Sequence, residues 1–408
     1  MFGRQLAGVV LALLASAVAS VSAADWPQWR GHDRDGRSAE TGLLREWPQS
    51  GPSLVWKTEG LGAGYSAFAI VQNRLFTQGQ RDGKQFVMAF DTASGKKLWE
   101  VQNGTAFEER RGHGPRGTPT VEEGRVYAVS ANGNLVCLEA GTGKIIWSVD
   151  LVNRLGGRIP HWGISESPLI DGENLIVTPG GPGAAIVALK KRTGDLVWKS
   201  QSDEAGYSSP IAVEADGTRA IVVFTGNGVV GLSPKNGELL WRYDKVSNRT
   251  ANIATPIARD RQVFVSSDYG TGCALLKLDA SDGGMKATEV YFTRDMRNHY
   301  STSVLVGDHL YGFSSSILTA MKFSDGQVAW QDRSVGKGSL TYAEGHLYLL
   351  GEDGSVALVE ATPKGYSEKS RFQIPRGAFP TWTPPVIANA RLYLREQDTL
   401  YSYDIKAQ

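Results

Sequence analysis

The sequence lacks most features that would identify an enzyme or a nucleic-acid-binding protein. Only two cysteines, Cys137 and Cys273, occur in 408 residues, which excludes a disulfide framework and favours buried free thiols. The 43 basic and 42 acidic residues nearly balance, so no net charge attracts nucleic acid or an anionic membrane. No Ser-His-Asp spacing, phosphate-binding loop or zinc-ligand cluster occurs. The sequence therefore predicts no catalytic residue and no metal site.

Long apolar runs are also missing, apart from one near the N-terminus. Arg4 precedes an almost wholly apolar stretch, residues 6–18, and small residues follow at 21–24. This order is typical of a cleaved secretory signal peptide, and the run is short for a membrane span. No cysteine lies near the cleavage site to accept a lipid. We therefore expect residues 1–24 to be a signal peptide and the mature chain to be periplasmic or secreted, with no membrane span.

The sequence is rich in glycine, with 48 residues against a usual share of about 7%. Many of these glycines belong to a repeated phrase. Five eleven-residue segments align without gaps, each with glycine seventh and tryptophan last: AFDTASGKKLW (89–99), CLEAGTGKIIW (137–147), ALKKRTGDLVW (188–198), GLSPKNGELLW (231–241) and AMKFSDGQVAW (320–330). The polar residue before each glycine favours a tight turn between two antiparallel strands. Each segment is therefore predicted to be a hairpin whose tryptophan docks on a neighbouring sheet.

Two further strand-like stretches precede each hairpin. The first begins at a Ser/Thr-Pro step and the second follows a short turn, as in TPTV (118–121) and RVYAVS (125–130). Four short antiparallel strands in about 40–50 residues are typical of a propeller blade. Units with divergent hairpins, ending at 286–292 and 367–374, raise the number of inner strands to eight. These strands are predicted to begin near Tyr65, Thr118, Ser167, Ser209, Thr255, Thr302, Ser339 and Thr383.

The two ends of the repeat predict how the ring closes. The last unit stops after three strands, whereas SLVWK (53–57) resembles an outermost strand without a blade. Pairing them leaves fewer exposed sheet edges. The predicted fold is all-β: an eight-bladed β-propeller of four-stranded antiparallel blades over residues 52–408, closed by pairing the N-terminal strand with the C-terminal blade. Residues 25–51 are predicted to be a strap whose Trp26 and Trp29 cover propeller surface. The predicted docking residues are Trp56, Trp99, Trp147, Trp198, Trp241 and Trp330.

The repeated pattern A-x-D-x-x-T-G-x-x-x-W resembles the tryptophan-docking motif of the PQQ-like β-propellers. That superfamily includes the quinoprotein alcohol dehydrogenases and the outer-membrane assembly factor BamB. A closer similarity is to exported bacterial PQQ-binding-like β-propeller repeat proteins, and it is carried by DWPQWRG (25–31), GPSLVW (51–56), GPRGTPTV (114–121), HWGISESPLIDG (161–172), GYSSPI (206–211) and YGTGCALLKL (269–278). The resemblance covers the mature chain and implies its fold, whereas function varies among proteins of one fold.

The resemblance implies two functions. One is a non-catalytic platform, as in the BamB branch, that binds a protein or a small-molecule or glycan ligand. The alternative is a PQQ-dependent alcohol or sugar dehydrogenase with PQQ and calcium at the propeller mouth. Many such dehydrogenases carry two adjacent cysteines against the cofactor and a Glu/Asn set for calcium. This sequence has no adjacent cysteines and no matching calcium set, which favours the platform.

In a radial arrangement of blades, the residues just before the inner strands meet at one mouth of the central channel. Aromatic walls with a few polar groups are typical of a binding site, and arginine or lysine there would hold carboxylates. The same side chains could instead fill the channel and pack on one another. Glu166 would act as a general base, or would hydrogen-bond within its loop or pair with Arg116. The predicted ligand-binding residues are Tyr65, Arg116, Trp162, Glu166, Tyr207, Asn252, His299, Tyr300, Lys337 and Trp382.

Overall fold

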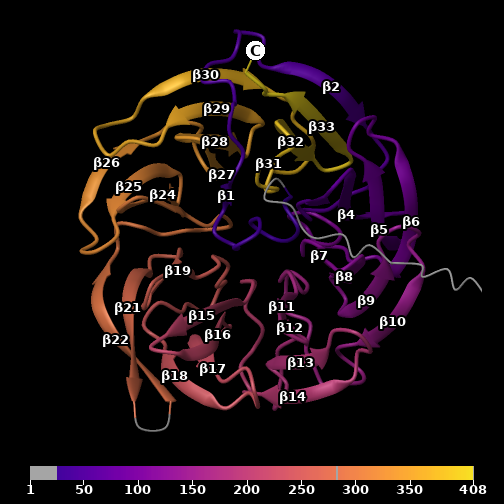
Figure 1. The fold of residues 1–408 in the computed structure, drawn as a ribbon, viewed down its shortest axis with the longest axis vertical. Coiled ribbons are helices and arrows are strands. Elements are labelled where there is room, and N and C mark those ends of the chain that lie inside the picture. The colour runs from indigo at the N-terminus through magenta and orange to yellow at the C-terminus, as the bar shows by residue number, and fades with distance from the viewer. Residues whose placement is uncertain (1–24, 282–283, 408) are drawn as a thin grey trace, which may run out of the picture.

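The structure, a computed structural model, describes residues 25–281 and 284–407, and the predicted signal peptide lies outside them. All regular secondary structure in the described residues is β-strand, and the strands are numbered β1 to β33. Figure 1 shows eight sheets arranged as blades in a ring, which confirms the predicted eight-bladed propeller. No helix in the described part of the chain is long and apolar enough to cross a membrane.

Each of the first four blades has four strands that follow one another in sequence from the channel to the rim. Blade 1 contains β3 (Ala69–Val71), β4 (Arg74–Arg81), β5 (Lys84–Asp91) and β6 (Lys97–Thr105). Blade 2 contains β7 (Thr120–Glu122), β8 (Arg125–Val129), β9 (Asn134–Glu139) and β10 (Ile145–Asp150). Blade 3 contains β11 (Leu169–Asp171), β12 (Asn174–Val177), β13 (Ile186–Lys190) and β14 (Leu196–Ser200). Blade 4 contains β15 (Ile211–Ala215), β16 (Thr218–Phe224), β17 (Val229–Leu232) and β18 (Leu239–Tyr243).

The last four blades include the two that receive strands from the N-terminal segment. Blade 5 contains β19 (Ile257–Arg259), β20 (Gln262–Ser267), β21 (Gly272–Ser281) and β22 (Gly284–Thr293). Blade 6 contains β23 (Val304–Val306), β24 (His309–Ser314), β25 (Ile317–Lys322) and β26 (Val328–Asp332). Blade 7 contains β27 (Gly338–Ala343), β28 (His346–Gly351), β29 (Ser355–Glu360) and β30 (Glu368–Gln373), with β1 (Arg37–Ser38) added at its channel side. Blade 8 contains β31 (Val386–Ala388), β32 (Arg391–Glu396), β33 (Thr399–Asp404) and β2 (Ser53–Thr58).

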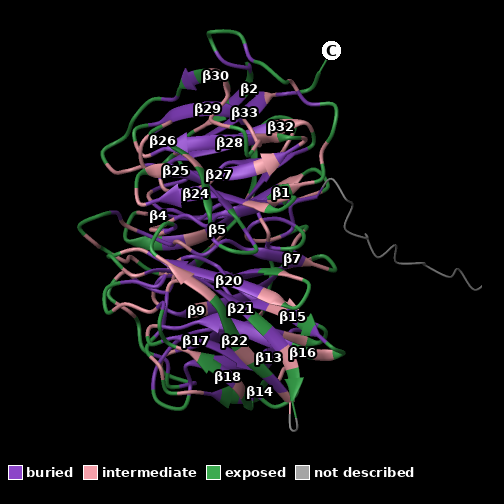
Figure 2. Cartoon of the chain, turned by 90° about the vertical axis from the view of Figure 1, so that its left-hand side faces the viewer, coloured by how far each residue is buried: buried purple, intermediate pink, exposed green. Residues whose placement is uncertain are grey.

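Burial follows the position of each strand in its blade. The middle strands, such as β8 and β9, are almost wholly buried between neighbouring sheets, whereas outer strands such as β10 alternate between exposed and covered residues. Figure 2 shows the same division, with buried strands inside and exposed residues on the loops and outer strands. Each fully buried Val or Leu contributes about 1.5–3 kcal/mol, so the sheet-to-sheet contacts hold the ring together. Where the predicted start is a Ser/Thr-Pro step, at Thr118, Ser167, Ser209, Thr255 and Thr383, the inner strand begins two or three residues later. The proline of that step cannot donate to a strand partner.

The ring closes where the sequence predicts. β2 pairs antiparallel with β33, with Ser53 opposite Asp404 and Trp56 opposite Ser402. From blade 8, the buried Arg395 guanidinium then donates to the carbonyl oxygens of Gly62, Ser66 and Gln78 at 2.6–3.1 Å. Both ends of the chain therefore hold the junction between blades 8 and 1.

The repeated tryptophans dock each blade on the next. Trp198 of blade 3 donates its indole N–H to the Pro234 carbonyl of blade 4 at 3.0 Å, and a Cβ added to Gly237 would lie 2.6 Å from its ring. The glycine is required here because its φ is +73° and because the ring occupies the space of a side chain. Equivalent indole-to-carbonyl bonds are made by Trp56, Trp99, Trp147 and Trp330. The Trp241 indole is buried without such a partner among the described residues.

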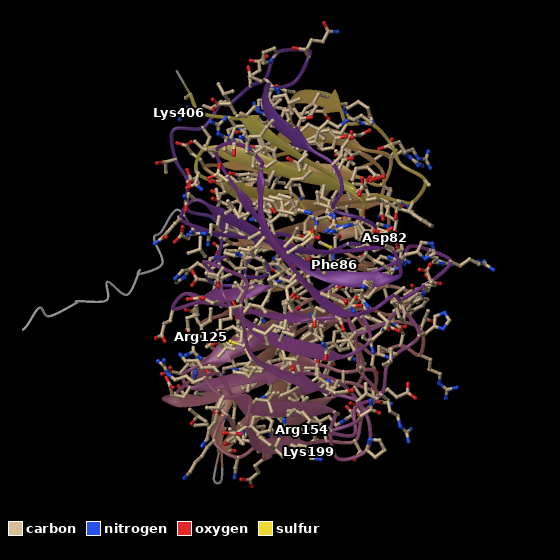
Figure 3. All side chains as sticks on the ribbon, turned by 90° about the vertical axis from the view of Figure 1, so that its right-hand side faces the viewer. Asp82, Phe86, Arg125, Arg154, Lys199 and Lys406 are labelled. Carbon is tan, nitrogen blue, oxygen red and sulfur yellow. The ribbon has the colours of Figure 1, made fainter. Side chains whose placement is uncertain are left out.

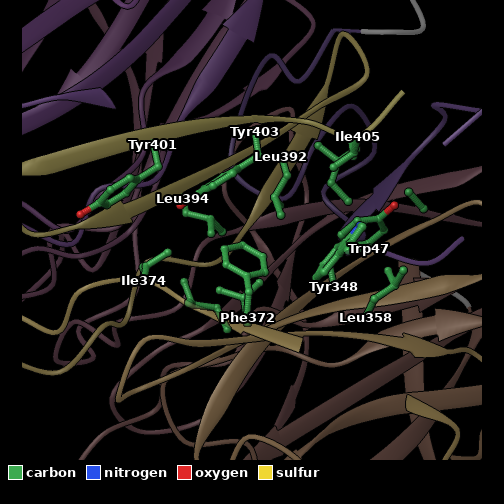
Figure 4. Close-up of a cluster of buried hydrophobic side chains, with 14 of the residues drawn as sticks. Trp47, Tyr348, Leu358, Phe372, Ile374, Leu392, Leu394, Tyr401, Tyr403 and Ile405 are labelled. Carbon is green, nitrogen blue, oxygen red and sulfur yellow. The ribbon is translucent and has the colours of Figure 1, made fainter. Parts of the chain in front are cut away.

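Two blades replace the docking tryptophan. In blade 5 the Tyr291 hydroxyl donates to the Phe323 carbonyl at 3.1 Å, and its ring covers Gly326. Between blades 7 and 8, the N-terminal segment inserts Trp47, whose ring lies 5.4 Å from that of Phe372. Figure 4 shows this cluster, with Trp47 beside Tyr348 among the aliphatic side chains of both blades.

The N-terminal segment predicted as a strap lies inside the ring. Residues 25–38 pass through the centre of the ring, where Figure 1 shows β1, and Trp26 is buried there against Ile70. The buried Arg34 guanidinium donates to the carbonyls of Ser167, Pro168 and Pro210 at 2.6–3.0 Å. The segment thus donates to carbonyls that the first residues of blades 3 and 4 leave without a strand partner.

Candidate functional site

A cavity opens at the mouth where the chain enters the inner strands. It encloses about 120 Å³, enough for several water molecules. The loops before the inner strands supply most of its wall, because every blade directs that loop to the same end of the channel. Its lining residues are Trp29, Tyr65, Arg111, Arg116, Trp162, Ser165, Tyr207, Ser209, Ile253, Thr255, Tyr269, His299, Tyr300, Trp382 and Pro384.

Aromatic rings form two parts of the wall. Trp382 has Tyr65 at 4.9 Å on one side and a stacked Tyr300 at 5.4 Å on the other, measured between ring centroids. Across the mouth, Trp162 packs against Tyr207 at 5.4 Å. Such pairs contribute about 0.5–1.5 kcal/mol beyond their burial. The rings therefore hold one another in place and present flat apolar faces to a ligand.

The N-terminal segment closes the cavity from below. Trp29 lines the floor and donates its indole N–H to the Thr255 hydroxyl at 2.9 Å. Deeper in the channel, Arg30 donates to the carbonyls of Thr302 and Ser303, before the inner strand of blade 6, at 3.2 and 2.7 Å. Arg34 donates to carbonyls before the inner strands of blades 3 and 4. The cavity is consequently a blind pocket on the propeller axis.

The side chains that line the cavity include arginines but no carboxylate. Arg111 forms no ion pair with any residue that the structure describes. The Arg116 guanidinium lies 5.3 Å from the Tyr65 ring centroid, donates to the carbonyls of Gly112 and Gly114, and is 3.9 Å from the Glu109 carboxylate. The local charge therefore favours an anionic ligand.

His299 and Tyr300 lie in the same wall, and each also has a buried polar atom. Burial, helped by the nearby charge of Lys337, lowers the pKa of His299 to about 4, so the ring is neutral at pH 7. Its Nε2 lies 3.0 Å from the Tyr269 hydroxyl, whereas its Nδ1 is buried without a hydrogen-bond partner among the described residues. The Tyr300 hydroxyl is likewise buried and unpartnered, and burial raises its pKa well above the usual value. Neither of these two atoms is exposed to the cavity.

Seven of the ten predicted ligand-binding residues line this cavity. The other three do not. Asn252 is buried and donates to the carbonyls of Thr225 and Gly226 within the loops. The Lys337 ammonium lies behind the wall, 5.6 Å from the Tyr300 ring centroid and 3.5 Å from Glu352. That the seven bind a ligand stays a prediction.

Glu166 is the third predicted residue outside the cavity. It is buried deeper in the channel, where its Oε1 accepts the Thr178 amide at 2.9 Å. Burial raises its pKa to about 7, against the lowering effects of that hydrogen bond and of Arg34. The hydrogen bond expected within its loop is made instead to Thr178, which follows β12, and the alternative partner Arg116 lies against Glu109.

Eight of the fifteen lining residues were missed by the sequence reasoning, among them Trp29, Arg111 and Tyr269. That reasoning considered only the position directly before each inner strand. Tyr269 instead lies in the turn between β20 and β21, and Arg111 lies in the long loop before blade 2. The DWPQWRG segment was a usable signal for Trp29, but its path through the channel was not predictable from its sequence.

A second, polar cavity continues from the first. It encloses about 310 Å³ and shares Tyr207 with the mouth cavity. The loop 151–164 forms one side, with Arg158, Ile159 and His161, and the loop after β18 forms the other, with Arg249. Neither arginine forms an ion pair with the described residues. The two cavities therefore adjoin at Tyr207.

The residues present do not fit a calcium-dependent quinone site. Calcium takes oxygen ligands, mainly from carboxylates and carboxamides, and none of these lines the mouth cavity. No group of three or more His, Cys, Asp or Glu side chains in residues 25–281 and 284–407 could hold a metal ion. The flat walls and arginines would suit a planar anion without a metal.

Comparison with known sequences agrees with the resemblance. A sequence profile of the family described as outer membrane protein assembly factor BamB matches residues 83–332. BamB of Moranella endobia is 25% identical over 260 residues, which cover 60% of this chain and 64% of that protein. The quinoprotein alcohol dehydrogenase PedH of Pseudomonas putida is 31% identical over 194 residues, which cover 45% of this chain and only 31% of that enzyme.

Solved structures share the fold. BamB from Moraxella catarrhalis superimposes with a TM-score of 0.64 at 16% identity and covers 87% of this chain, and 98% of that structure is matched. The quinohemoprotein alcohol dehydrogenase from Comamonas testosteroni gives a TM-score of 0.65 at 13% identity, with 96% of this chain and 82% of that structure matched. At these identities the likeness concerns the propeller fold alone.

Proposed function

Since the chain belongs to the family of the outer membrane protein assembly factor BamB, we propose that it is a non-catalytic platform outside the cytoplasm. Its partner is a polypeptide, and the mouth face is its binding surface. The observation that carries the proposal is the composition of the mouth cavity: aromatic walls and two arginines, with no carboxylate among the lining side chains.

This composition supports binding rather than catalysis. General acid–base catalysis needs a group that titrates near the working pH. In the cavity, burial lowers the pKa of His299 to about 4, and burial raises the pKa of Tyr300. Glu166, whose pKa is about 7, is buried in the channel beside Arg34 and lines no part of the cavity.

The proposal is tested by photo-crosslinking in the producing bacterium. A benzoylphenylalanine at Ile159, which is 43% exposed beside the mouth, is compared with one at Lys144, which is exposed in the turn between β9 and β10 on the opposite face. We expect adducts with the same exported partner proteins, identified by mass spectrometry, from Ile159 alone. Equal yields from both faces, or no adduct at Ile159, would contradict the proposal.

A PQQ-dependent alcohol or sugar dehydrogenase is the second candidate, supported by the flat aromatic walls and by the similarity to PedH over 194 residues. Incubating the purified protein with PQQ, calcium and an alcohol or sugar separates the two. We expect no dye reduction, because the cavity has no oxygen ligands for calcium. Saturable PQQ binding with turnover would contradict the platform proposal and support the dehydrogenase.

A further inference from the structure

We propose that the mouth cavity receives the C-terminal aromatic residue of a polypeptide, with its ring between the aromatic walls and its terminal carboxylate held by Arg111 and Arg116. This inference rests on the proposed function, because it specifies which part of a polypeptide partner the platform binds.

The closed floor restricts what can enter. A polypeptide cannot pass through the channel, since Trp29 forms the floor and the buried side chains of Arg30 and Arg34 lie below it. A ligand on the axis must therefore end in the cavity. A chain terminus meets this condition, and so does a single inserted side chain.

The polar groups select the chain terminus over an internal side chain. Arg111 has no ion pair among the described residues, and Arg116 has only the Glu109 carboxylate at 3.9 Å. The two guanidinium groups call for an anionic ligand with several acceptor lone pairs, which a terminal carboxylate supplies beside its own side chain. An internal residue brings only neutral peptide groups to the same place.

The walls select an aromatic side chain for that terminus. Trp382, stacked on Tyr300, faces the Trp162–Tyr207 pair across the mouth. An aromatic ring inserted between such walls makes offset or edge-to-face contacts and loses little conformational entropy on binding. An aliphatic side chain would bury apolar area but would lack these ring contacts.

The second cavity provides a path for the preceding residues. It begins at Tyr207, which both cavities share, and runs between Arg158 and Arg249, with the Glu204 carboxylate also at its wall. Mixed charges and a volume of about 310 Å³ suit the polar backbone of an extended chain and the water around it.

The test measures the fluorescence anisotropy of short N-terminally labelled peptides with the purified protein. A peptide that ends in phenylalanine with a free carboxylate is compared with its C-terminal amide and with a version that ends in alanine. We expect amidation to weaken binding by about tenfold or more, since charge-assisted hydrogen bonds are lost. The alanine version is expected to weaken by a similar factor.

Two arginine variants connect this effect to the cavity. R111A removes an exposed side chain and is expected to weaken the free-acid peptide by about two- to fivefold without changing the affinity of the amide. R116A is expected to weaken binding of the free-acid peptide more strongly than R111A does. The matched control is R154A, which removes an exposed mouth-side arginine that lines neither cavity and is labelled in Figure 3. We expect R154A to leave both affinities unchanged.

Three results would overturn the inference: equal binding of acid and amide, no binding of any peptide, or displacement by free hydrocinnamate as effective as by unlabelled peptide. The last would assign the cavity to a free aromatic acid. If acid and amide bind equally while the Ile159 adducts persist, the platform stands and terminal recognition fails. If the adducts are absent as well, both proposals fail.

Discussion

Replacing Glu166 by glutamine tests how the channel holds its buried charges. The carboxyl is buried, its Oε1 accepts one amide, and its Oε2 has no hydrogen-bond partner among the described residues. Burial raises the pKa to about 7 from an ordinary value of 4.5, and the charge of Arg34 only partly opposes that effect. The folded protein therefore keeps Glu166 protonated at pH values where the unfolded chain has ionised it.

The sign and size of the effect follow from this shift. A raised pKa means that the folded state binds the proton more tightly, so its contribution to stability is complete below pH 4.5 and is lost as the pH rises to about 7. At 1.36 kcal/mol per pKa unit, the loss amounts to about 3 kcal/mol. Glutamine does not titrate, so E166Q is expected to escape this loss. Relative to the variant, the wild-type protein should thus be about 3 kcal/mol less stable at pH 8 than at pH 4.

Urea unfolding of both proteins between pH 4 and 8 measures this difference. E214Q, which alters an exposed glutamate of β15, is the control and should follow the pH dependence of the wild type. A constant difference between wild type and E166Q would mean that folding does not shift the pKa of Glu166, and it would contradict the reasoning. If the difference changed with pH in the opposite direction, the effect of Arg34 on the pKa of Glu166 would outweigh the effect of burial. That result would refute the reasoning.

The remaining predictions concern packing. Deleting residues 53–57 removes β2 and should lower the melting temperature sharply, and an unchanged melting temperature would contradict closure by this strand. G237A should destabilise more than G217A in urea, because both glycines have positive φ but only at Gly237 would the new Cβ meet Trp198; equal losses would argue against the docking contact. The G217A change itself should cost about 1–3 kcal/mol. The thiols of Cys137 and Cys273, whose pKa values burial raises to about 11 and 12, should react with a thiol reagent only after unfolding, and fast reaction of the native protein would contradict their burial.

The blades could be predicted from the sequence because each blade repeats a local pattern. A glycine turn followed by a tryptophan specifies a hairpin and its docking surface, and the orphaned strand at 53–57 specified closure. Divergent blades were harder to predict. Tyr291 performs the docking of blade 5 without a tryptophan, and Trp47 reaches blades 7 and 8 from the N-terminal segment.

The site was predictable only as far as the repeat continued. Residues at one repeat position, such as Tyr65 and Trp382, converge on the mouth as the radial arrangement requires. Trp29 and Arg34 belong to no repeat, so their places depend on long-range contacts that no local pattern encodes. For the same reason the sequence placed Glu166 at the rim, whereas the N-terminal segment provides the charge that accompanies it inside the channel.

The account depends most on the N-terminal segment inside the ring, since that segment makes the mouth a blind pocket. Native-state hydrogen exchange of residues 26–36 measures directly whether this segment is held inside the ring. The amides of Trp26, Arg34 and Gly36 donate to backbone carbonyls within the channel, so they should exchange as slowly as those of the buried strands β8 and β9. Exchange as fast as that of the exposed turns would contradict a closed channel, and with it the blind pocket.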